Sequence, residues 1–464
     1  MSQMTISRRG FMGAMGAGAI GAAGLWPRQA SAQVQSLTIQ PASYVVLDQP
    51  TQAMVSAYAD APPPVIRMAQ GQPFAIDVTN ATPDYTAMHW HGLRVPNAMD
   101  GVPYLTQFPI AQDETFRYAF TPTDAGTYWY HPHCMTMDQM ARGMTGVLIV
   151  DEADPLDFDA EVVLNLRDFR LNSAGEFIDL WTPRGAARSG TFGTVMTANW
   201  SQLDRHDVPT GGLVRLRLAA TDTTRIYKLI LEGAAGEVIA MDGHPLREGV
   251  PFPSVETPLV LSPGQRAEIV VKMPAVEGAL VTVLTDAPGA PRALAQLRSV
   301  GAPLGRVLAA APQLLPNPVT EPDLTAPRVE EFVFGWTPEG GPPVDGLCGS
   351  LGYSFWSINR TPWQGDAAEN TPALATFQKG ESVVLRLRNE SPNDHPIHLH
   401  GMTFRPISSN KRYLPSNWTD TALLLRDETI EIAMVMDNPG DWAFHCHVIE
   451  HQKTGLAGFI RVVG

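Results

Sequence analysis

Residues 378–401 read QKGESVVLRLRNESPNDHPIHLHG, and residues 69–92 read AQGQPFAIDVTNATPDYTAMHWHG. The two stretches align without a gap, so that Gly71 matches Gly380 and Asn80 matches Asn389. In each, alternating apolar and polar residues precede a His-x-His-Gly motif. Alternation with a period of two is typical of strands that bury one face. The repeat therefore predicts two domains of one kind, towards the two ends of the chain.

A second block of sequence repeats further along each of these domains. Asp113-Glu114-Thr115 aligns with Asp427-Glu428-Thr429, and the His-x-His motif at 131–133 aligns with the one at 445–447. The middle of the chain, between these two domains, has similar strand patterns but no histidine cluster. Short strand-like runs separated by Gly and Pro favour an all-β fold. We expect three β-sandwich domains and one Pro- and Ala-rich linker, at 37–156, 157–300, 301–328 (the linker) and 329–464.

The first 32 residues are expected to be an export signal that is not part of the fold. Ser7-Arg8-Arg9-Gly10 precedes a weakly apolar Gly/Ala stretch and then Ala30-Ser31-Ala32. Paired arginines, an apolar stretch and small residues in this order are typical of a twin-arginine signal. The apolar stretch is short and glycine-rich for a spanning helix. We expect export of the folded protein to the periplasm or medium, with no membrane span in the mature chain.

Charge and cysteine content constrain the partners. The formal net charge is -14 at pH 7, and an acidic surface repels nucleic acid. We therefore expect no nucleic-acid partner, and we expect a monomer. The three cysteines are Cys134, Cys348 and Cys446, so at least one is unpaired. Because export permits disulfides, Cys134 and Cys348 could form one at the junction of the first and third domains.

Histidine clusters indicate a metal centre. Ten of the 12 histidines fall in four short clusters. Residues two apart on a strand face the same way, so each His-x-His directs two imidazoles to one side. Four pairs give eight imidazoles, enough for about three metal ions at two or three nitrogens each. These imidazoles belong to His89, His91, His131, His133, His398, His400, His445 and His447.

Cys446 lies between two of these histidines and therefore faces the opposite side of its strand. Together with His395 and His451 it supplies one thiolate and two imidazoles, the trigonal ligand set of a blue copper site. The first domain has Pro132 in place of Cys446 and Thr86 in place of His395. We therefore expect a mononuclear copper site in the third domain alone.

The axial position of this site is also informative. Leu456 is the residue ten positions after Cys446, where a blue copper site ordinarily has a weak Met ligand. Leucine cannot coordinate a metal. If Leu456 is the axial residue, the missing donor favours Cu(I) and raises the reduction potential.

Four motifs resemble those of the three-domain multicopper oxidases, the family that contains laccases and bacterial cuprous oxidases. The resemblance covers nearly the whole mature chain and implies cupredoxin-like Greek-key β-sandwiches. It also implies four copper ions, namely one type 1, one type 2 and two type 3. The motifs are His89-Trp90-His91-Gly92, His131-Pro132-His133, His395-Pro396-Ile397-His398-Leu399-His400 and His445-Cys446-His447-Val448-Ile449-Glu450-His451.

The resemblance assigns a role to each ligand. It implies that His395, Cys446 and His451 bind type 1 copper. It implies that His89 and His398 bind type 2 copper. It implies that the two type 3 ions are held by His91, His131 and His447, and by His133, His400 and His445.

Proton delivery involves acids near the cluster. The resemblance implies that Asp100, in Met99-Asp100-Gly101, helps to deliver protons to the metals, because O2 reduction consumes them; a turn-forming Asp-Gly is the alternative. Many bacterial members have a Glu directly after the type 1 histidine, whereas this chain has Gln452. Glu450 is nearby and is a second candidate acid.

We expect an oxidase of laccase type, which oxidises a phenol or aromatic amine one electron at a time and reduces O2 to water. The reductant is expected to dock near His451 or His395. One alternative keeps the chemistry and oxidises Cu(I) for copper tolerance. Another is a non-catalytic copper-binding or envelope scaffold protein, which the full ligand set disfavours. A two-domain copper nitrite reductase is disfavoured by the three-domain layout.

Overall fold

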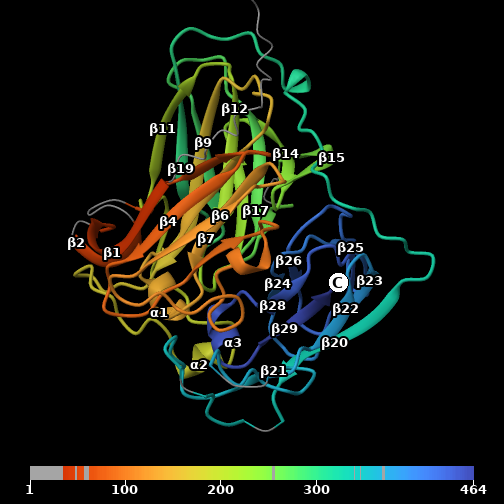
Figure 1. Cartoon of the computed structure of the whole chain (residues 1–464). Helices are drawn as coiled ribbons and strands as arrows, with labels where there is room; N and C mark the ends of the chain where they lie inside the picture. The colour runs from red at the N-terminus through yellow and green to blue at the C-terminus, as the bar shows by residue number, and fades with distance from the viewer. Residues whose placement is uncertain are drawn as a thin grey trace, which may run out of the picture. The chain divides into compact units, whose positions relative to one another are not determined.

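The computed structural model describes residues 35–47, 50–56, 62–252, 257–338, 340–344, 346–367 and 371–464. The expected export signal at 1–32 lies outside the described residues. Strands dominate the described chain and form six sheets (Figure 1). Among the described residues, no helix has the length and hydropathy needed to cross a membrane.

The first sandwich contains strands β1 to β8. One sheet has the order β2-β1-β4-β6 and the other β3-β8-β7-β5. Their facing side chains form one core, which includes Trp90, Tyr118 and Tyr130. The strands are β1 Gln35–Val45, β2 Pro50–Ser56, β3 Ile66–Ala69, β4 Phe74–Asn80, β5 Met88–His91, β6 Thr115–Phe120, β7 Gly126–Pro132 and β8 Gly146–Asp151.

The middle sandwich contains strands β9 to β19. Its sheets have the orders β10-β9-β12-β17-β14-β15 and β11-β19-β18-β13-β16, and an aliphatic core lies between them. The strands are β9 Ala160–Phe169, β10 Val195–Ala198, β11 Asp204–Pro209, β12 Leu213–Ala220, β13 Tyr227–Glu232, β14 Ala235–Met241, β15 His244–Pro251, β16 Leu259–Leu261, β17 Arg266–Lys272, β18 Leu280–Thr285 and β19 Arg292–Val300.

The third sandwich contains strands β20 to β29. Its sheets have the orders β21-β20-β23-β27-β25 and β22-β29-β28-β24-β26, with Phe332, Phe444 and Trp442 in the core between them. The strands are β20 Arg328–Trp336, β21 Trp356–Ile358, β22 Ala375–Gln378, β23 Ser382–Asn389, β24 His395–Leu399, β25 Arg405–Ser409, β26 Thr421–Leu424, β27 Thr429–Val435, β28 Gly440–Cys446 and β29 Ala457–Val463.

Element boundaries differ slightly from the expected domain limits. β1 begins at Gln35, before the expected start at 37, and β20 begins at Arg328, the last residue of the expected linker. The linker itself contains one short 3-10 turn, Leu308–Ala310. Three short helices complete the description: α1 Thr136–Ala141, α2 Pro183–Ala186 and α3 Ile449–Lys453.

The alternating strand at β12 is buried on both faces. Arg215 and Arg217 are almost fully buried, and both pair with the buried Glu268 of β17. Glu268 also accepts a hydrogen bond from Thr127 of β7, in the first sandwich. Buried charges persist in proteins when they are paired and hydrogen-bonded. The arginine side of this strand therefore forms part of the contact between the first and middle sandwiches.

Candidate metal centre

Cys446, His395 and His451 come together at one end of the third sandwich. Cys446 ends β28, His395 begins the neighbouring β24, and His451 lies in α3, which follows β28 directly. The Cys446 Sγ lies 3.6 Å from the Nδ1 of His395 and 3.6 Å from the Nδ1 of His451. The two Nδ1 atoms are 3.1 Å apart. All three side chains are buried, and their donor atoms could hold one metal ion.

The protonation of these three groups suits a soft metal. Burial lowers the pKa of His451 to about 4 and that of His395 well below its usual value, so both imidazoles are neutral and carry a lone pair. Burial also raises the pKa of the Cys446 thiol. A buried thiolate needs a cation beside it. Copper, which binds thiolate and imidazole, fits this donor set.

Leu456 is held beside this group by the backbone. Its carbonyl accepts a hydrogen bond of 3.0 Å from the Cys446 amide, and its own amide donates to the His451 carbonyl at 2.9 Å. Its side chain is fully buried in the same core as Cys446. The structure therefore places the aliphatic side chain of Leu456 in the core that contains Cys446.

The eight remaining motif histidines meet between the first and third sandwiches. Strand register brings them together, because His89 faces His131 across β5 and β7, and His398 faces His445 across β24 and β28. Rings from the two sandwiches then stack on each other, with centroids 3.8 Å apart for His89 with His400 and 3.8 Å for His91 with His398.

The donor atoms of these histidines form several candidate triads. His133, His400 and His445 group as the resemblance implies. His91, His131 and His447 have ring centroids 4.9 to 5.9 Å apart, but their donor atoms do not form one of the compact groups found in the described chain. The compact groups are His89/His398/His400, His89/His91/His131, His133/His400/His445 and His91/His398 with Asp420.

Unpartnered nitrogens show that this cluster fits a metal. Buried imidazole nitrogens normally have hydrogen-bond partners. Burial lowers the pKa of His445 to about 3 and holds those of His131 and His447 well below the usual value, so these rings are neutral ligands. Buried nitrogens without a partner among the described residues are His89 Nε2, His91 Nδ1, His131 Nε2, His398 Nε2 and both ring nitrogens of His447.

Asp100 lies at the cluster, as expected for the proton-delivering acid. It is fully buried, and its Oδ2 lies 2.9 Å from the Nδ1 of His400. Its Oδ1 lies 3.2 Å from the Nδ1 of His89. Glycine is required at position 101, directly after this acid, because a Cβ there would lie 1.8 Å from the Met88 carbonyl oxygen. Asp100 therefore contacts one histidine of its own sandwich, by a hydrogen bond of 2.9 Å at its backbone carbonyl, and one of the third through its carboxylate.

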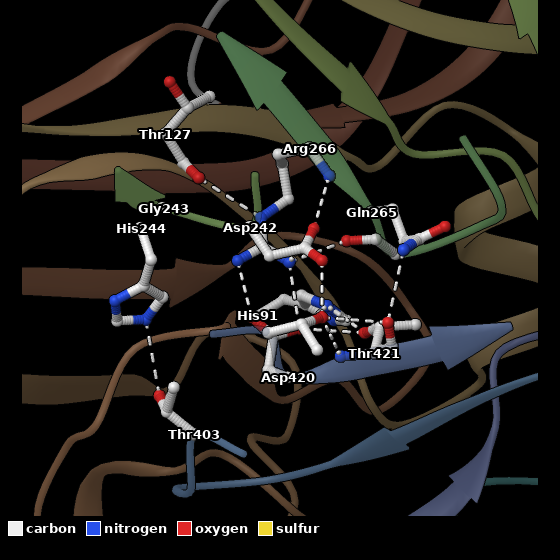
Figure 2. A network of polar contacts seen from close by, with 12 residues as sticks. His91, Thr127, Asp242, Gly243, His244, Gln265, Arg266, Thr403, Asp420 and Thr421 are labelled. Atoms are coloured by element: carbon white, nitrogen blue, oxygen red, sulfur yellow. Dashed lines mark hydrogen bonds and ion pairs between the residues drawn. The ribbon is translucent and has the colours of Figure 1, made fainter. Parts of the chain in front are cut away.

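Sequence reasoning missed a second buried acid, Asp420, and its partner Arg266 (Figure 2). Asp420 Oδ1 lies 3.1 Å from the Nε2 of His91, and its backbone carbonyl lies 2.9 Å from the Nδ1 of His398. Arg266 of β17 donates to both carboxylate oxygens of Asp420, at 2.9 and 2.6 Å. Neither residue belongs to the repeated blocks, so the sequence alone gave no signal for them.

This ion pair fixes the charge of Asp420. Burial is the largest single effect and acts to raise its pKa, but the guanidinium of Arg266 together with hydrogen bonds from His398 and His91 holds the pKa well below its usual range. Arg266 also lies 3.3 Å from Asp242. Because Arg266 belongs to the middle sandwich, Asp420 to the third and His91 to the first, all three sandwiches meet at this side of the cluster.

The two other residues named for proton supply occupy different surroundings. Glu450 is buried, and its carboxylate accepts hydrogen bonds from Thr182 and Thr191 of the middle sandwich. No hydrogen bond joins it to a histidine in the part of the chain that the structure describes. Gln452, by contrast, reaches the cluster, with its Nε2 lying 3.4 Å from the Nε2 of His133.

The two remaining cysteines lie close to the cluster. Cys134 and Cys348 form a disulfide with an S–S distance of 2.06 Å, which links the first and third sandwiches. A cavity of about 380 Å³ lies nearby, and its lining includes His133, His445 and Gln452. This cavity is a route by which small molecules could approach the cluster.

Comparisons with known proteins identify the family of this chain. Family models described as "Multicopper oxidase" match residues 38–155 and 349–463. The chain is 27% identical to "Multicopper oxidase MmcO" of Mycobacterium tuberculosis, over 97% of this chain and 95% of the relative. It is also 27% identical to "Laccase-1" of Fomitopsis schrenkii, over 85% of this chain and 80% of that protein.

Solved structures show the same relationship. A multi-copper oxidase from Pseudomonas thermotolerans is 35% identical, with a TM-score of 0.83, and the match covers 93% of this chain and 100% of that one. The enzyme from Pseudomonas parafulva is 36% identical with a TM-score of 0.81, at the same coverage. With its cupredoxin-like sandwiches, clustered imidazoles and buried thiol, this chain belongs to the multicopper oxidases, the copper-dependent oxidoreductases that pass electrons from a reductant to O2.

Proposed function

We propose that this protein is an oxidase of laccase type, which oxidises phenols and aromatic amines one electron at a time and reduces O2 to water with four electrons. The observation that carries this proposal is the position of Cys446. Its buried sulfur lies 3.6 Å from two imidazole nitrogens, while its neighbours His445 and His447 point into the histidine cluster.

Four copper ions are the proposed complement. His395, Cys446 and His451 would hold the type 1 ion, and His89 with His398 the type 2 ion. The type 3 ions would be held by His91, His131 and His447, and by His133, His400 and His445. When bound, these ions supply four one-electron stores and a site at which O2 is reduced.

The chain itself supplies the connection between these two centres. Cys446 is bonded through the main chain to His445 on one side and to His447 on the other. Electron entry and O2 reduction are therefore joined by a short covalent path. Since β28 is buried along its second half, this path is shielded from water and from side reactions.

The chain also supplies a proton donor. Asp100 Oδ2 lies 2.9 Å from a nitrogen of His400 in a site without exposed surface. An acid at hydrogen-bond distance from a reacting centre contributes about 10² to 10⁴ in rate. Gln452 cannot donate an acidic proton, but its amide at His133 can hold a water molecule from the neighbouring cavity. We assign proton delivery to Asp100.

Export by the twin-arginine route to the periplasm or the medium is part of the proposal. One support is the sequence of residues 1–32, in which paired arginines, an apolar stretch and small residues follow one another. The other is the disulfide between Cys134 and Cys348, because disulfides persist in oxidising compartments. Export in the folded state would allow copper to be loaded before translocation.

A metal-ion reductant is the second candidate, and one cavity favours it. A cavity of about 570 Å³ is lined by Met135, Met137, Asp138 and Asp179 among others, and thioethers bind Cu(I). The relatives include a yeast protein described as "Iron transport multicopper oxidase FET3", at 26% identity. In this reading the enzyme oxidises Cu(I) or another metal ion in place of a phenol.

A direct comparison of reductants tests the proposal. The copper-loaded enzyme would be assayed for O2 consumption with dimethoxyphenol, with phenylenediamine and with Cu(I), and its copper content measured per chain. We expect about four coppers and faster turnover of the two aromatic reductants. A preference for Cu(I) would establish the second candidate, and a chain that binds copper but consumes no O2 would refute both.

A further inference from the structure

The imidazoles expected to receive electrons from the reductant are covered. His395 and His451 have no exposed surface. The Nε2 of His451, which points away from Cys446, lies 2.5 Å from the carbonyl oxygen of Arg188 in the middle sandwich. The reductant was expected to dock at one of these two rings. In this structure a segment of the middle sandwich occupies that position.

The covering segment is 182–191, which we call the cap. It contains helix α2 and is anchored at three places on the third sandwich. Arg188 contacts His451, and Ala186 accepts a hydrogen bond of 2.7 Å from the indole of Trp356. Trp356 packs in turn against the rings of His395 and His451, at 5.0 and 4.7 Å. The cap therefore touches both imidazoles, one directly and one through Trp356.

Glu450 is the third anchor. Its side chain is buried and accepts hydrogen bonds from the Thr191 hydroxyl at 2.6 Å, from the Thr191 amide, and from the Thr182 amide at 3.4 Å. All of these donors belong to the cap. Because a buried carboxylate needs hydrogen-bond donors, Glu450 ties the position of the cap to helix α3, which carries His451.

The cap is closely packed, and its two ends contact each other. The Thr182 and Thr191 hydroxyls lie 3.1 Å apart, and Thr182 caps helix α2 by accepting from the Gly185 amide. A Cβ on Gly185 would lie 1.9 Å from the Thr191 hydroxyl. Arg184 and Arg188 nevertheless have exposed side chains. The cap is thus a thin layer between solvent and His451, held mainly by polar contacts.

We propose that the cap selects reductants by size, with Glu450 as its clasp; this inference rests on the proposed function. With the cap closed, a small aromatic reductant occupies the cavity beside it, whose lining includes Trp181, Thr182 and Pro183. A large reductant has to displace the cap before it comes near His451. Glu450 is then a positioning residue, and it donates no proton to the cluster. Loops that close over a site commonly decide which substrates react.

The test uses the copper-loaded full chain with Thr191→Val. Valine keeps the shape of threonine but removes the hydroxyl contacts to Glu450 and Thr182. The matched control is Thr197→Val, because Thr197 lies in the middle sandwich, is buried where Thr191 is half-buried, and donates a single hydrogen bond to the Arg167 carbonyl. Glu450→Gln is the second clasp variant, since it removes the negative charge that accepts the hydrogen bonds from Thr191 and Thr182.

Two reductants with the same reacting ring measure selectivity. Dimethoxyphenol is the small probe, and syringaldazine, which carries that ring twice, is the large one. We expect Thr191→Val to raise the ratio of kcat/KM for syringaldazine over dimethoxyphenol by about tenfold, as the loss of a buried hydrogen bond would allow. Thr197→Val should leave the ratio unchanged. An unchanged ratio in both clasp variants, or an equal loss with both phenols, would overturn the proposal.

A second readout does not depend on turnover. Trypsin cuts after the exposed Arg184 and Arg188 only when the segment opens, because proteolysis needs local unfolding. We expect cleavage at these two sites to be about tenfold faster in Thr191→Val than in Thr197→Val. Equal cleavage rates in the two variants would overturn the proposal that Thr191 and Glu450 hold the cap closed. If the wild-type enzyme oxidised neither phenol, the proposed function would fail, while the cleavage rates would still decide whether the clasp exists.

Discussion

The first and third sandwiches repeat each other, yet among the described residues only the third brings a thiol and two imidazoles together as a candidate mononuclear metal group. In the third, His395 Nδ1 lies 3.1 Å from His451 Nδ1, and the Leu456 amide donates to the His451 carbonyl. In the first, the Thr86 hydroxyl lies 2.9 Å from the Gln139 side-chain oxygen, and the Met144 amide donates to the Gln139 carbonyl.

The matching hydrogen bonds identify equivalent positions. Thr86 and Gln139 of the first sandwich occupy the places of His395 and His451, and Pro132 occupies that of Cys446. The first sandwich satisfies these buried positions with one ordinary hydrogen bond, whereas the third presents three metal donors. The comparison teaches that a change of three side chains at equivalent positions separates a sandwich without this thiol-containing donor group from one that presents it.

The two buried acids that contact the histidine cluster offer a second comparison. Asp100 of the first sandwich contacts His89 and His400, while Asp420 of the third contacts His91 and His398. Each acid therefore bridges one histidine from each sandwich. They differ in one respect, because Asp420 is paired with Arg266 and Asp100 contacts no Lys or Arg among the described residues. We infer that Asp100 exchanges protons and that Asp420 anchors the cluster.

Replacing Cys446 with Ser should have the largest effect, because the third sandwich then lacks the thiolate that the first sandwich also lacks. We expect loss of the blue thiolate-to-copper colour and a fall in turnover of at least about a thousandfold, or about 4 kcal/mol of barrier. Copper content should fall from about four to about three per chain. Absorption spectra, metal analysis and O2 uptake check this. A variant that turned over within about tenfold of the wild type would contradict the assigned electron path.

Changing each of the two acids to its amide should affect different properties, turnover for Asp100 and stability for Asp420. Asp100→Asn should lower turnover by about a hundredfold with little change in stability, because it removes the proton donor. Asp420→Asn should lower the free energy of unfolding by about 3 kcal/mol, because it leaves the buried Arg266 without its closest counter-charge. Steady-state rates and denaturant unfolding of the copper-loaded variants measure both. If Asp420→Asn left stability unchanged, the anchoring role would be wrong.

Replacing Leu456 with Met should have the smallest effect. The first sandwich already carries Met144 at the equivalent place, so the backbone accommodates methionine there. An axial thioether stabilises Cu(II), and we expect a lower reduction potential with turnover reduced by less than about tenfold. A redox titration of the blue absorption band measures the change. An unchanged potential would show that Leu456 is not the axial residue.

Several features of the site followed from local sequence patterns. Histidines two apart on a strand must point the same way, so the cluster could be predicted from the four His-x-His pairs, and the opposite direction of Cys446 from 445–447. The repeat showed that the first sandwich lacks a mononuclear group, because it compares equivalent positions within one chain. The position of Asp100 followed from the resemblance to multicopper oxidases.

Other features depend on contacts between distant segments, which no local pattern encodes. The alternating arginines of β12 are buried against Glu268 of β17, and Thr127 of the first sandwich also contacts that carboxylate. Arg266 and Asp420 meet only when the middle and third sandwiches pack. Glu450, which the sequence offered as an acid for the cluster, contacts Thr191 instead.

The sequence by itself determined the class of fold and the candidate donors, because strand periodicity and side-chain type decide which side chains face the same way within a sandwich. Only the tertiary structure decided how the centre is covered and held. The cap over His451, the Arg266–Asp420 anchor and the link between Cys134 and Cys348 each join residues from different sandwiches. Such contacts depend on how separately folded surfaces pack, and packing is a property of the whole chain.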